Sequence, residues 1–266
     1  MAPGDVTRAA NKVEGQPLVR IGARVGYAIS GLLHLLIGWI ALQVAWSASA
    51  KSADQSGALQ TVAGNSLGQL TLWVAVVGFL ALGLLQLANG FSAPATSGSS
   101  AWADRGKSLS KGFVYLALAW TCLSFAKGSP TSSKSQSADF TATLLQKPGG
   151  RVLVAVVGLV VIGVGGYHVM KGWTKKFLQD LTEHPGALLT RAGTVGYIAK
   201  GVALAIVGIL FMTAAARDSA SKATGLDGAL RSLRGQPLGS WLLTAVALGI
   251  AAYGVYSLAR ARYARV

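Results

Sequence analysis

The chain has 266 residues, of which 52% are apolar and only 12% are charged, and its formal charge is +15 at pH 7. Water-soluble domains carry about 25% charged residues, so this composition excludes an ordinary soluble domain and indicates a protein of the lipid bilayer. The basic excess does not indicate nucleic-acid binding, because the Lys and Arg residues lie beside apolar runs, where they face anionic lipid headgroups.

Six apolar stretches approach the length of about 20 residues that a spanning helix needs. In chain order, the predicted spans are Val25–Trp46, Leu70–Asn89, Leu109–Ala126, Val152–Lys171, Val195–Ala216 and Trp241–Leu258. The connecting segments are rich in Ser, Thr, Gly and Pro and are predicted to be exposed loops. Ala48-Ser49-Ala50 resembles a signal-peptide cleavage site, but the apolar run before it is longer than the about 7–15 residues of a signal peptide. We therefore expect the first span to be retained.

The distribution of Lys and Arg predicts the orientation, because these residues gather on the cytoplasmic side of a membrane. The side that holds both termini carries 14 of them and the opposite side 9, with Lys200 inside a span left out. We expect a multi-pass protein of the bacterial inner (plasma) membrane with both termini in the cytoplasm.

An internal repeat is clearest between the first and last thirds of the chain. Gly26-Tyr27 followed by Gly31 recurs as Gly196-Tyr197 followed by Gly201. The second half of the repeat also recurs: Gly57-Ala58-Leu59 and Gly64-Asn65-Ser66-Leu67-Gly68 match Gly228-Ala229-Leu230 and Gly235-Gln236-Pro237-Leu238-Gly239. A period of about 80–90 residues suits a unit of two membrane helices.

A more divergent copy lies between these two. Its Lys111-Gly112 aligns with Lys200-Gly201 and with Ser30-Gly31, and its Ala155-Val156-Val157-Gly158 repeats Ala75-Val76-Val77-Gly78. This alignment pairs Gly163 with Gly83 and Gly254. The middle copy lacks the Gly-Tyr pair, near which Lys107-Ser108 stand, and it lacks the Gly-Ala-Leu segment.

The predicted fold class is an all-α integral membrane protein with six transmembrane helices. Each copy contains an outward helix, a short amphipathic segment such as Leu230 to Arg234, a Gly-rich turn and a return helix. Three parallel two-helix copies predict pseudo-threefold symmetry about the membrane normal. The expected parts are an N-terminal segment over 1–23, repeats over 24–91, 105–173 and 191–259, and a basic tail over 260–266.

These residues resemble a known family. The Gly-Tyr-x-x-x-Gly helix start and the Gly-Ala-Leu-x-x-x-x-Gly-x-x-Leu-Gly segment are similar to those of the bacterial membrane family called domain of unknown function 1206. The resemblance covers residues 20 to 260 and implies three tandem two-helix repeats. It implies no activity, substrate or catalytic residue.

No motif for catalysis, metal binding or a cofactor stands out, and none of these is expected. The predicted spans contain no acidic residue, so a carboxylate proton relay lacks its usual parts. Cys122 is the single cysteine and is interpreted as a packing residue. His34 and His168 lie on two different spans and could in principle ligate a haem, but intramembrane histidines are more often hydrogen-bonded packing residues.

Polar residues inside the spans gather in the half of the membrane that holds the termini. Ser30, Lys111 and Lys200 are equivalent in the three copies, and His34 and Tyr115 lie one turn further along their helices. With His168, these six residues are the candidate ligand-binding residues of a cytoplasm-facing polar cavity. The alternative is that the lysines snorkel to the headgroups, or that the cluster only packs helices together.

Two functions remain open. The first is a non-catalytic module that assembles or stabilises a cell-envelope complex, which the lack of a catalytic set and the surplus of packing glycines favour. The second is a transporter or binder of a small anion or an anionic lipid headgroup, which the polar cluster favours. The expected partners are the bilayer, its anionic lipids and a membrane protein, but no nucleic acid.

Overall fold

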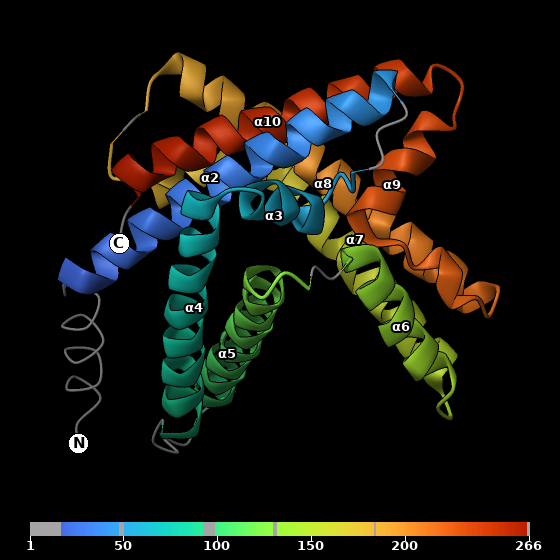
Figure 1. The fold of residues 1–266 in the computed structure, drawn as a ribbon, viewed down its shortest axis with the longest axis horizontal. Coiled ribbons are helices and arrows are strands. Elements are labelled where there is room, and N and C mark those ends of the chain that lie inside the picture. Colours follow the sequence, from blue (N-terminus) through green and yellow to red (C-terminus); the bar gives the residue numbers. More distant parts are fainter. Residues whose placement is uncertain (1–16, 48–50, 93–98, 130–131, 184, 265–266) are drawn as a thin grey trace. The chain divides into compact units, whose positions relative to one another are not determined.

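The computed structural model describes residues 17–47, 51–92, 99–129, 132–183 and 185–264 (Figure 1). Residues 1–16 of the predicted N-terminal segment, Ala48-Ser49-Ala50 and the last two residues of the tail lie outside these ranges. The described chain is helical, with the elements α2 (Pro17–Trp46), α3 (Gln55–Ala63), α4 (Ser66–Ser92), α5 (Ser99–Ala126), α6 (Ser133–Leu145), α7 (Gly150–Trp173), η1 (Lys176–Asp180), α8 (Ala187–Ala216), η2 (Ala220–Lys222), α9 (Gly225–Arg234) and α10 (Gly239–Tyr263).

Six of these helices are long and apolar enough to cross a membrane. They are the six expected from the sequence: Arg24–Trp46, Ser66–Ala88, Ser108–Ala126, Gly150–Trp173, Ala187–Ala216 and Gly239–Tyr263. Short helices α3, α6 and α9 precede the second helix of each copy, as predicted for the amphipathic segment. The all-helical fold class and the six spans are thereby confirmed.

The chain divides into two compact units, and the boundary falls inside α3 between Ala58 and Leu59. Unit 1 holds α2, α6, α7, α8, α9 and α10, and unit 2 holds α4 and α5. Within unit 1, α10 packs along α2, α7 packs along α8, and α8 also packs against α10; within unit 2, α4 packs along α5 (Figure 1).

The same glycine crossing joins all three helix pairs. A Cβ atom added to Gly254 of α10 would lie 2.8 Å from the carbonyl oxygen of Gly31 in α2. A Cβ atom added to Gly83 of α4 would lie 3.3 Å from the carbonyl oxygen of Gly112 in α5, and one added to Gly165 of α7 would lie 2.7 Å from that of Gly201 in α8. An added Cβ would be too close to backbone at Gly254 and Gly165 and tight against it at Gly83, so glycine at the crossing lets the backbones approach closely in lipid.

This packing corrects the alignment of the middle copy. The identical letters Ala-Val-Val-Gly pair Gly163 with Gly83 and Gly254, but Gly165 makes the equivalent contact and a Cβ on Gly163 would meet nothing within 4 Å. The alignment by identical letters is therefore wrong by two residues. The two aligned glycines Gly78 and Gly158 have different surroundings: a Cβ on Gly78 would meet nothing within 4 Å, whereas Gly158 packs on Gly208.

A second glycine position recurs at the turn before each return helix. A Cβ on Gly68, Gly150 or Gly239 would clash with the carbonyl oxygen of Val62, Leu144 or Arg234, respectively. The middle copy therefore keeps this turn although it lacks the Gly-Ala-Leu segment. The residue before the glycine is left-handed in two copies, at Gly149 (φ 74°) and Leu238 (φ 58°).

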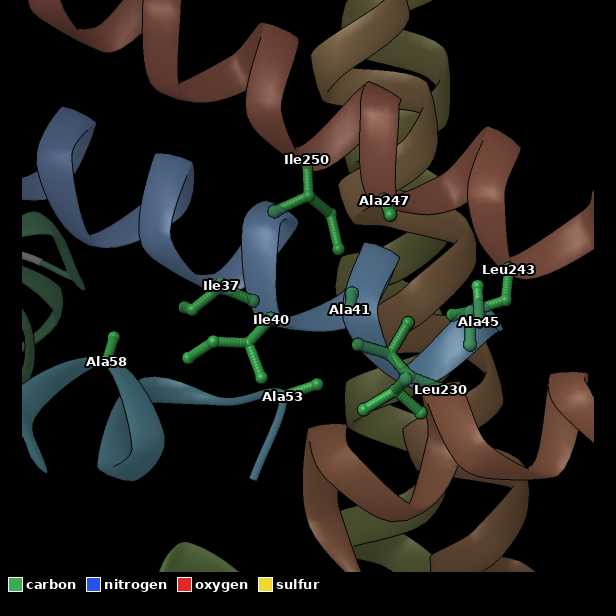
Figure 2. Close-up of a cluster of buried hydrophobic side chains, with 11 residues drawn as sticks. Ile37, Ile40, Ala41, Ala45, Ala53, Ala58, Leu230, Leu243, Ala247 and Ile250 are labelled. Atoms are coloured by element: carbon green, nitrogen blue, oxygen red, sulfur yellow. The ribbon is translucent and has the colours of Figure 1, made fainter. Parts of the chain in front are cut away.

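One of the buried clusters of unit 1 lies where α2, α9 and α10 meet. Ile37, Ile40 and Ala41 of α2 belong to one buried cluster with Leu243, Ala247 and Ile250 of α10 and Leu230 of α9, and Figure 2 shows Ile40 on the side of α2 where Ala53 lies. The amphipathic helix α9 is tied to the chain after α2 by Asp227, whose Oδ1 accepts a hydrogen bond from the Ala53 backbone N–H at 2.8 Å. Arg231 donates to the same carboxylate at 2.9 Å and to the Lys51 carbonyl at 2.9 Å.

Candidate functional site

The position of Lys200 on α8 follows from the two faces of that helix. Val195, Val202 and Ile209 recur every seven residues and are 52%, 39% and 54% exposed, so they form one outward stripe. At about 100° per residue, Lys200 lies on nearly the opposite face. Lys200 is half-buried within unit 1, and its amine is therefore not on the outward stripe of α8.

The Lys200 ammonium contacts an aromatic ring that α10 supplies. Its Nζ lies 4.3 Å from the centroid of the Tyr253 ring, within the range of a cation–π interaction. The ring of His34, from α2, lies 4.7 Å from the same Tyr253 ring. Gly196 of α8 lies directly against the Tyr253 backbone, because a Cβ atom added to Gly196 would lie only 2.5 Å from Tyr253 Cα. This close approach of α8 and α10 lets Tyr253 reach both partners.

The two intramembrane histidines pack on different tyrosines. His34 Nδ1 lies 2.7 Å from the Ser30 carbonyl oxygen, and His168 Nδ1 lies 2.9 Å from the Val164 carbonyl oxygen. The His168 ring packs at 5.8 Å from Tyr197, whose own ring lies 5.2 Å from Tyr253. Each histidine thus has a backbone partner and an aromatic neighbour, as expected of packing histidines.

Four of the six predicted site residues therefore belong to one cluster in unit 1: Ser30, His34, His168 and Lys200. The other two lie in unit 2. Tyr115 stacks on Phe79 with ring centroids 6.2 Å apart, and Lys111 is exposed in that unit. The prediction of a shared site that includes Lys111 and Tyr115 stays a prediction.

A charged border lies next to the aromatic residues, at the end of unit 1 where α7 and α10 finish. Lys171 Nζ lies 2.7 Å from Asp180 Oδ2, and Arg260 Nη2 lies 3.6 Å from the same oxygen. Arg260 Nη2 also donates a hydrogen bond to the Tyr27 hydroxyl at 3.1 Å. Lys171 lies over the Tyr197 ring at 5.5 Å, which joins this border to the cluster.

The segment that follows α7, residues 174–183, covers the aromatic residues and is called the covering segment. Phe177 of η1 is completely buried, with its ring 5.2 Å from Tyr197 and 5.0 Å from Tyr256. The Tyr256 hydroxyl donates to the Phe177 carbonyl at 3.2 Å. Further along, the Thr182 backbone N–H donates to the Tyr263 carbonyl at 2.8 Å, next to an antiparallel bridge between Leu181 and Ala264.

Sequence reasoning missed the residues that surround Lys200. Tyr197 is marked in the sequence only as part of the Gly-Tyr motif, and Asp180 lies outside the predicted spans, where an acidic residue is ordinary. A signal was present for the cations, because Lys171 and Arg260 each follow a crossing glycine, Gly165 or Gly254, by six residues. The two-residue error in aligning the middle copy hid this equivalence.

The arrangement is suited to holding a negatively charged group. Among the residues that the structure describes, no carboxylate forms an ion pair with Lys200. Within the same part of the chain, no group of three or more His, Cys, Asp or Glu side chains is placed to hold a metal ion. Nothing in the cluster points to catalysis.

The fold and the cluster define a multi-pass, all-helical membrane protein built from tandem repeats. The family model Domain of Unknown Function (DUF1206) matches the chain three times, at residues 25–93, 107–175 and 195–264, and the chain belongs to this family. It is also similar to the Uncharacterized protein YxxB of Bacillus subtilis (strain 168), with 27% identity over 99% of this chain and 98% of that protein. No solved structure matches the chain.

Proposed function

We propose that this protein binds an anionic group at the cluster around Lys200, Tyr253 and His34. The observation that supports the proposal is the Lys200 ammonium, half-buried in a membrane span and in contact with an aromatic ring, without a carboxylate partner in the described chain. A Lys near the centre of a spanning helix costs about 2.5–3.5 kcal/mol on insertion scales. Such a cost favours a lysine that is retained for binding.

The ligand chemistry is that of a phosphate or carboxylate group, from a lipid headgroup or from a small soluble anion. The ring that Lys200 contacts is enclosed: Tyr253 is 8% exposed, and the neighbouring Tyr197 and Tyr256 are buried. We therefore propose a closed binding site rather than the open cavity expected from the sequence. In this site the Tyr253 ring lies against the Lys200 ammonium and positions it for the anion.

Native mass spectrometry of the protein extracted gently from its own membrane tests this proposal. Lys200→Gln removes the charge and keeps a polar side chain that is shorter by about one bond. The matched control is Lys222→Gln, because Lys222 is exposed and lies outside the spans. We expect a copurifying anionic lipid or metabolite with the wild type and with Lys222→Gln, and its loss with Lys200→Gln. Equal occupancy in all three proteins would reject the site.

A second candidate function is a non-catalytic module that assembles or stabilises a cell-envelope complex. It is favoured by a shallow apolar hollow on α4, lined by Trp73, Val74, Val77 and Gly78. A transmembrane helix of a partner protein would fit against such a surface, because Gly78 leaves room for close approach. A stoichiometric partner that is lost in Gly78→Leu while the fold and the Lys200 ligand are retained would favour this function.

We also propose that the membrane is the bacterial plasma membrane and that both termini face the cytoplasm. The excess of Lys and Arg on the side of the termini supports this orientation. A single cysteine placed at exposed Lys176 tests it, with Lys222→Cys on the opposite side as the control. Membrane-impermeant thiol reagents added to intact cells should label only the Lys222→Cys variant.

A further inference from the structure

Asp180 holds two cations that occupy equivalent positions in two copies of the repeat. Lys171 lies six residues after the crossing glycine of α7, and Arg260 lies six residues after that of α10. Both reach the same carboxylate oxygen of Asp180, at 2.7 Å and 3.6 Å. The side chains of Lys171 and Arg260 are only 17% and 15% exposed, so two cations are held close together in a partly desolvated place.

The Asp180 carboxylate does not provide hydrogen-bond acceptors for all the N–H groups of this pair of cations. Its Oδ2 atom serves both partners, and the 3.6 Å separation from Arg260 is longer than a hydrogen bond. The Nε–H of Arg260 is buried and has no hydrogen-bond acceptor among the described residues. A guanidinium group usually binds oxyanions through two N–H groups at once, so a donor remains here for a ligand with more oxygens.

The position of Asp180 links this pair to the covering segment. Asp180 is the last residue of η1, which carries the buried Phe177 and continues to Leu181 and Thr182, where the segment meets the end of α10. Apart from Asp180, the contacts described for this segment with the helices are apolar or use uncharged groups: the Phe177 ring, the Tyr256 hydroxyl and the Tyr263 carbonyl. Loss of the Asp180 ion pairs therefore removes the electrostatic part of its attachment.

We infer that Lys171 and Arg260 form a binding site for a phosphate group, and that Asp180 occupies this site as an internal substitute for the ligand. A phosphate group presents several oxygens to the ammonium and to the guanidinium, including the unused Nε–H. When it displaces the Asp180 carboxylate, the segment over Tyr197 and Tyr256 is released. This inference rests on the proposed function in the class of ligand, but it concerns different residues.

Two substitutions that break the same ion pair separate binding from mere loosening of the segment. Asp180→Asn removes the competing charge and leaves both cations available, whereas Lys171→Gln also frees the segment but removes a ligand-binding cation. Glu183→Gln is the control, because Glu183 is an exposed acid on the same segment. The full-length protein is placed in phosphatidylcholine nanodiscs that contain increasing fractions of phosphatidylglycerol, and in a parallel series it is titrated with inorganic phosphate.

Two quantities are measured in each sample: ligand occupancy by native mass spectrometry, and the mobility of a spin label at Lys176→Cys by electron paramagnetic resonance. Cys122, the one native thiol, is buried and is replaced by Ser in all samples. We expect Asp180→Asn to bind about fivefold more tightly than the wild type and Lys171→Gln to bind more weakly, with a mobile label in both. Glu183→Gln should match the wild type.

The wild type provides a test that needs no substitution at Asp180: saturating phosphatidylglycerol should raise the mobility of the label. A response to phosphatidylglycerol alone identifies a lipid headgroup as the ligand, and an equal response to inorganic phosphate identifies the free anion. No gain in affinity in Asp180→Asn, together with an unchanged label in the lipid-saturated wild type, would overturn the inference. Lys200→Gln is run in the same series, because its loss of binding reports on the proposed function independently of Asp180.

Discussion

The helix pair α4 and α5 has the same glycine crossing as the helix pair α2 and α10, but the residues beside the crossing differ. Next to Gly83 of α4 stands Leu82, which is 43% exposed in unit 2. Next to Gly254 of α10 stands Tyr253, which is buried between His34 and Lys200. The repeated glycines therefore account for how the helices pair, and the candidate site comes from residues that differ between copies at the neighbouring positions.

The largest expected effect is at the crossing itself. Gly254→Leu should lower the free energy of unfolding by about 3 kcal/mol, at the upper end of the range for overpacking, because the new side chain meets backbone of α2. Gly83→Leu should cost about 2–3 kcal/mol, because the new side chain meets the Leu116 side chain before the backbone of α5. Unfolding in detergent, followed by helical circular dichroism, measures the loss. Gly78→Leu and Gly163→Leu are controls, since nothing lies within 4 Å of an added Cβ there. Equal losses in controls and crossing variants would show that these glycines do not form the helix contact.

A smaller loss is expected where α9 is tied to the chain after α2. Asp227→Asn should lower the free energy of unfolding by about 2–3 kcal/mol, because it leaves the Arg231 guanidinium without its buried counterion. The loss is below that of a fully buried pair because the Arg231 side chain is 36% exposed. The same unfolding measurement checks it. An Asp227→Asn protein as stable as the wild type would show that the apolar contacts of Leu230 alone hold α9.

Exchanging the residue beside the crossing tests the origin of the site. Tyr253→Leu gives α10 the residue that α4 has, and it should reduce ligand occupancy about tenfold through loss of the cation–π contact with Lys200. Titrated native mass spectrometry measures occupancy, and circular dichroism verifies the fold. The reciprocal Leu82→Tyr should leave ligand occupancy unchanged. If Tyr253→Leu bound normally, the ring would be only a packing group.

The turn before α10 should gain stability from a glycine. Leu238 is left-handed, with φ 58°, and is 76% exposed, so its side chain contributes little packing at a strained position. Leu238→Gly should raise the free energy of unfolding by up to about 1 kcal/mol, because glycine adopts this conformation without steric cost. Gly149→Ala at the equivalent turn should lower it by a similar amount. A change of the opposite sign in either variant would contradict the description of these turns.

The smallest effect is expected at the ion pair between Arg151 of α7 and Asp218, which follows α8. The hydrogen bond and the charge of Arg151 hold the pKa of the Asp218 carboxyl below its ordinary value. A lowered pKa in the folded state means that the pair stabilises the fold above the ordinary value of 3.8 and that this contribution disappears as the pH falls through the lowered pKa. Both side chains are well exposed, so the effect is small.

Asp218→Asn isolates the charge, because Asn also tolerates the left-handed backbone at this position (φ 50°). The difference in melting temperature between wild type and Asp218→Asn should be constant at neutral pH and should shrink as the pH falls below the ordinary carboxyl pKa. A constant difference over the whole range would assign the effect to the backbone rather than to the ion pair.

The spans and the repeat could be predicted from sequence, because both depend on features that are local in the chain: the length of an apolar run, and the spacing of glycines. Which helices contact one another could not be predicted, since the crossing of Gly31 with Gly254 joins residues more than 200 positions apart. Lys200 was found through its cost in a bilayer and its equivalence to Lys111. Asp180 and Phe177 were missed because their role depends on how a loop returns to the end of α10, which no local pattern records.

The pairing of α10 with α2 has one further consequence. The other two crossings join spans that follow one another in the chain, α4 to α5 and α7 to α8, whereas here the last of the six spans pairs with the first of them. The end of α10 also lies at the start of α2, where Ser257 and Arg260 bond to Tyr27. Helix order is therefore cyclic, so a circular permutant that joins these two helices and opens the chain between α4 and α5 keeps every crossing. The same property fits an origin in a single two-helix unit that once assembled with copies of itself.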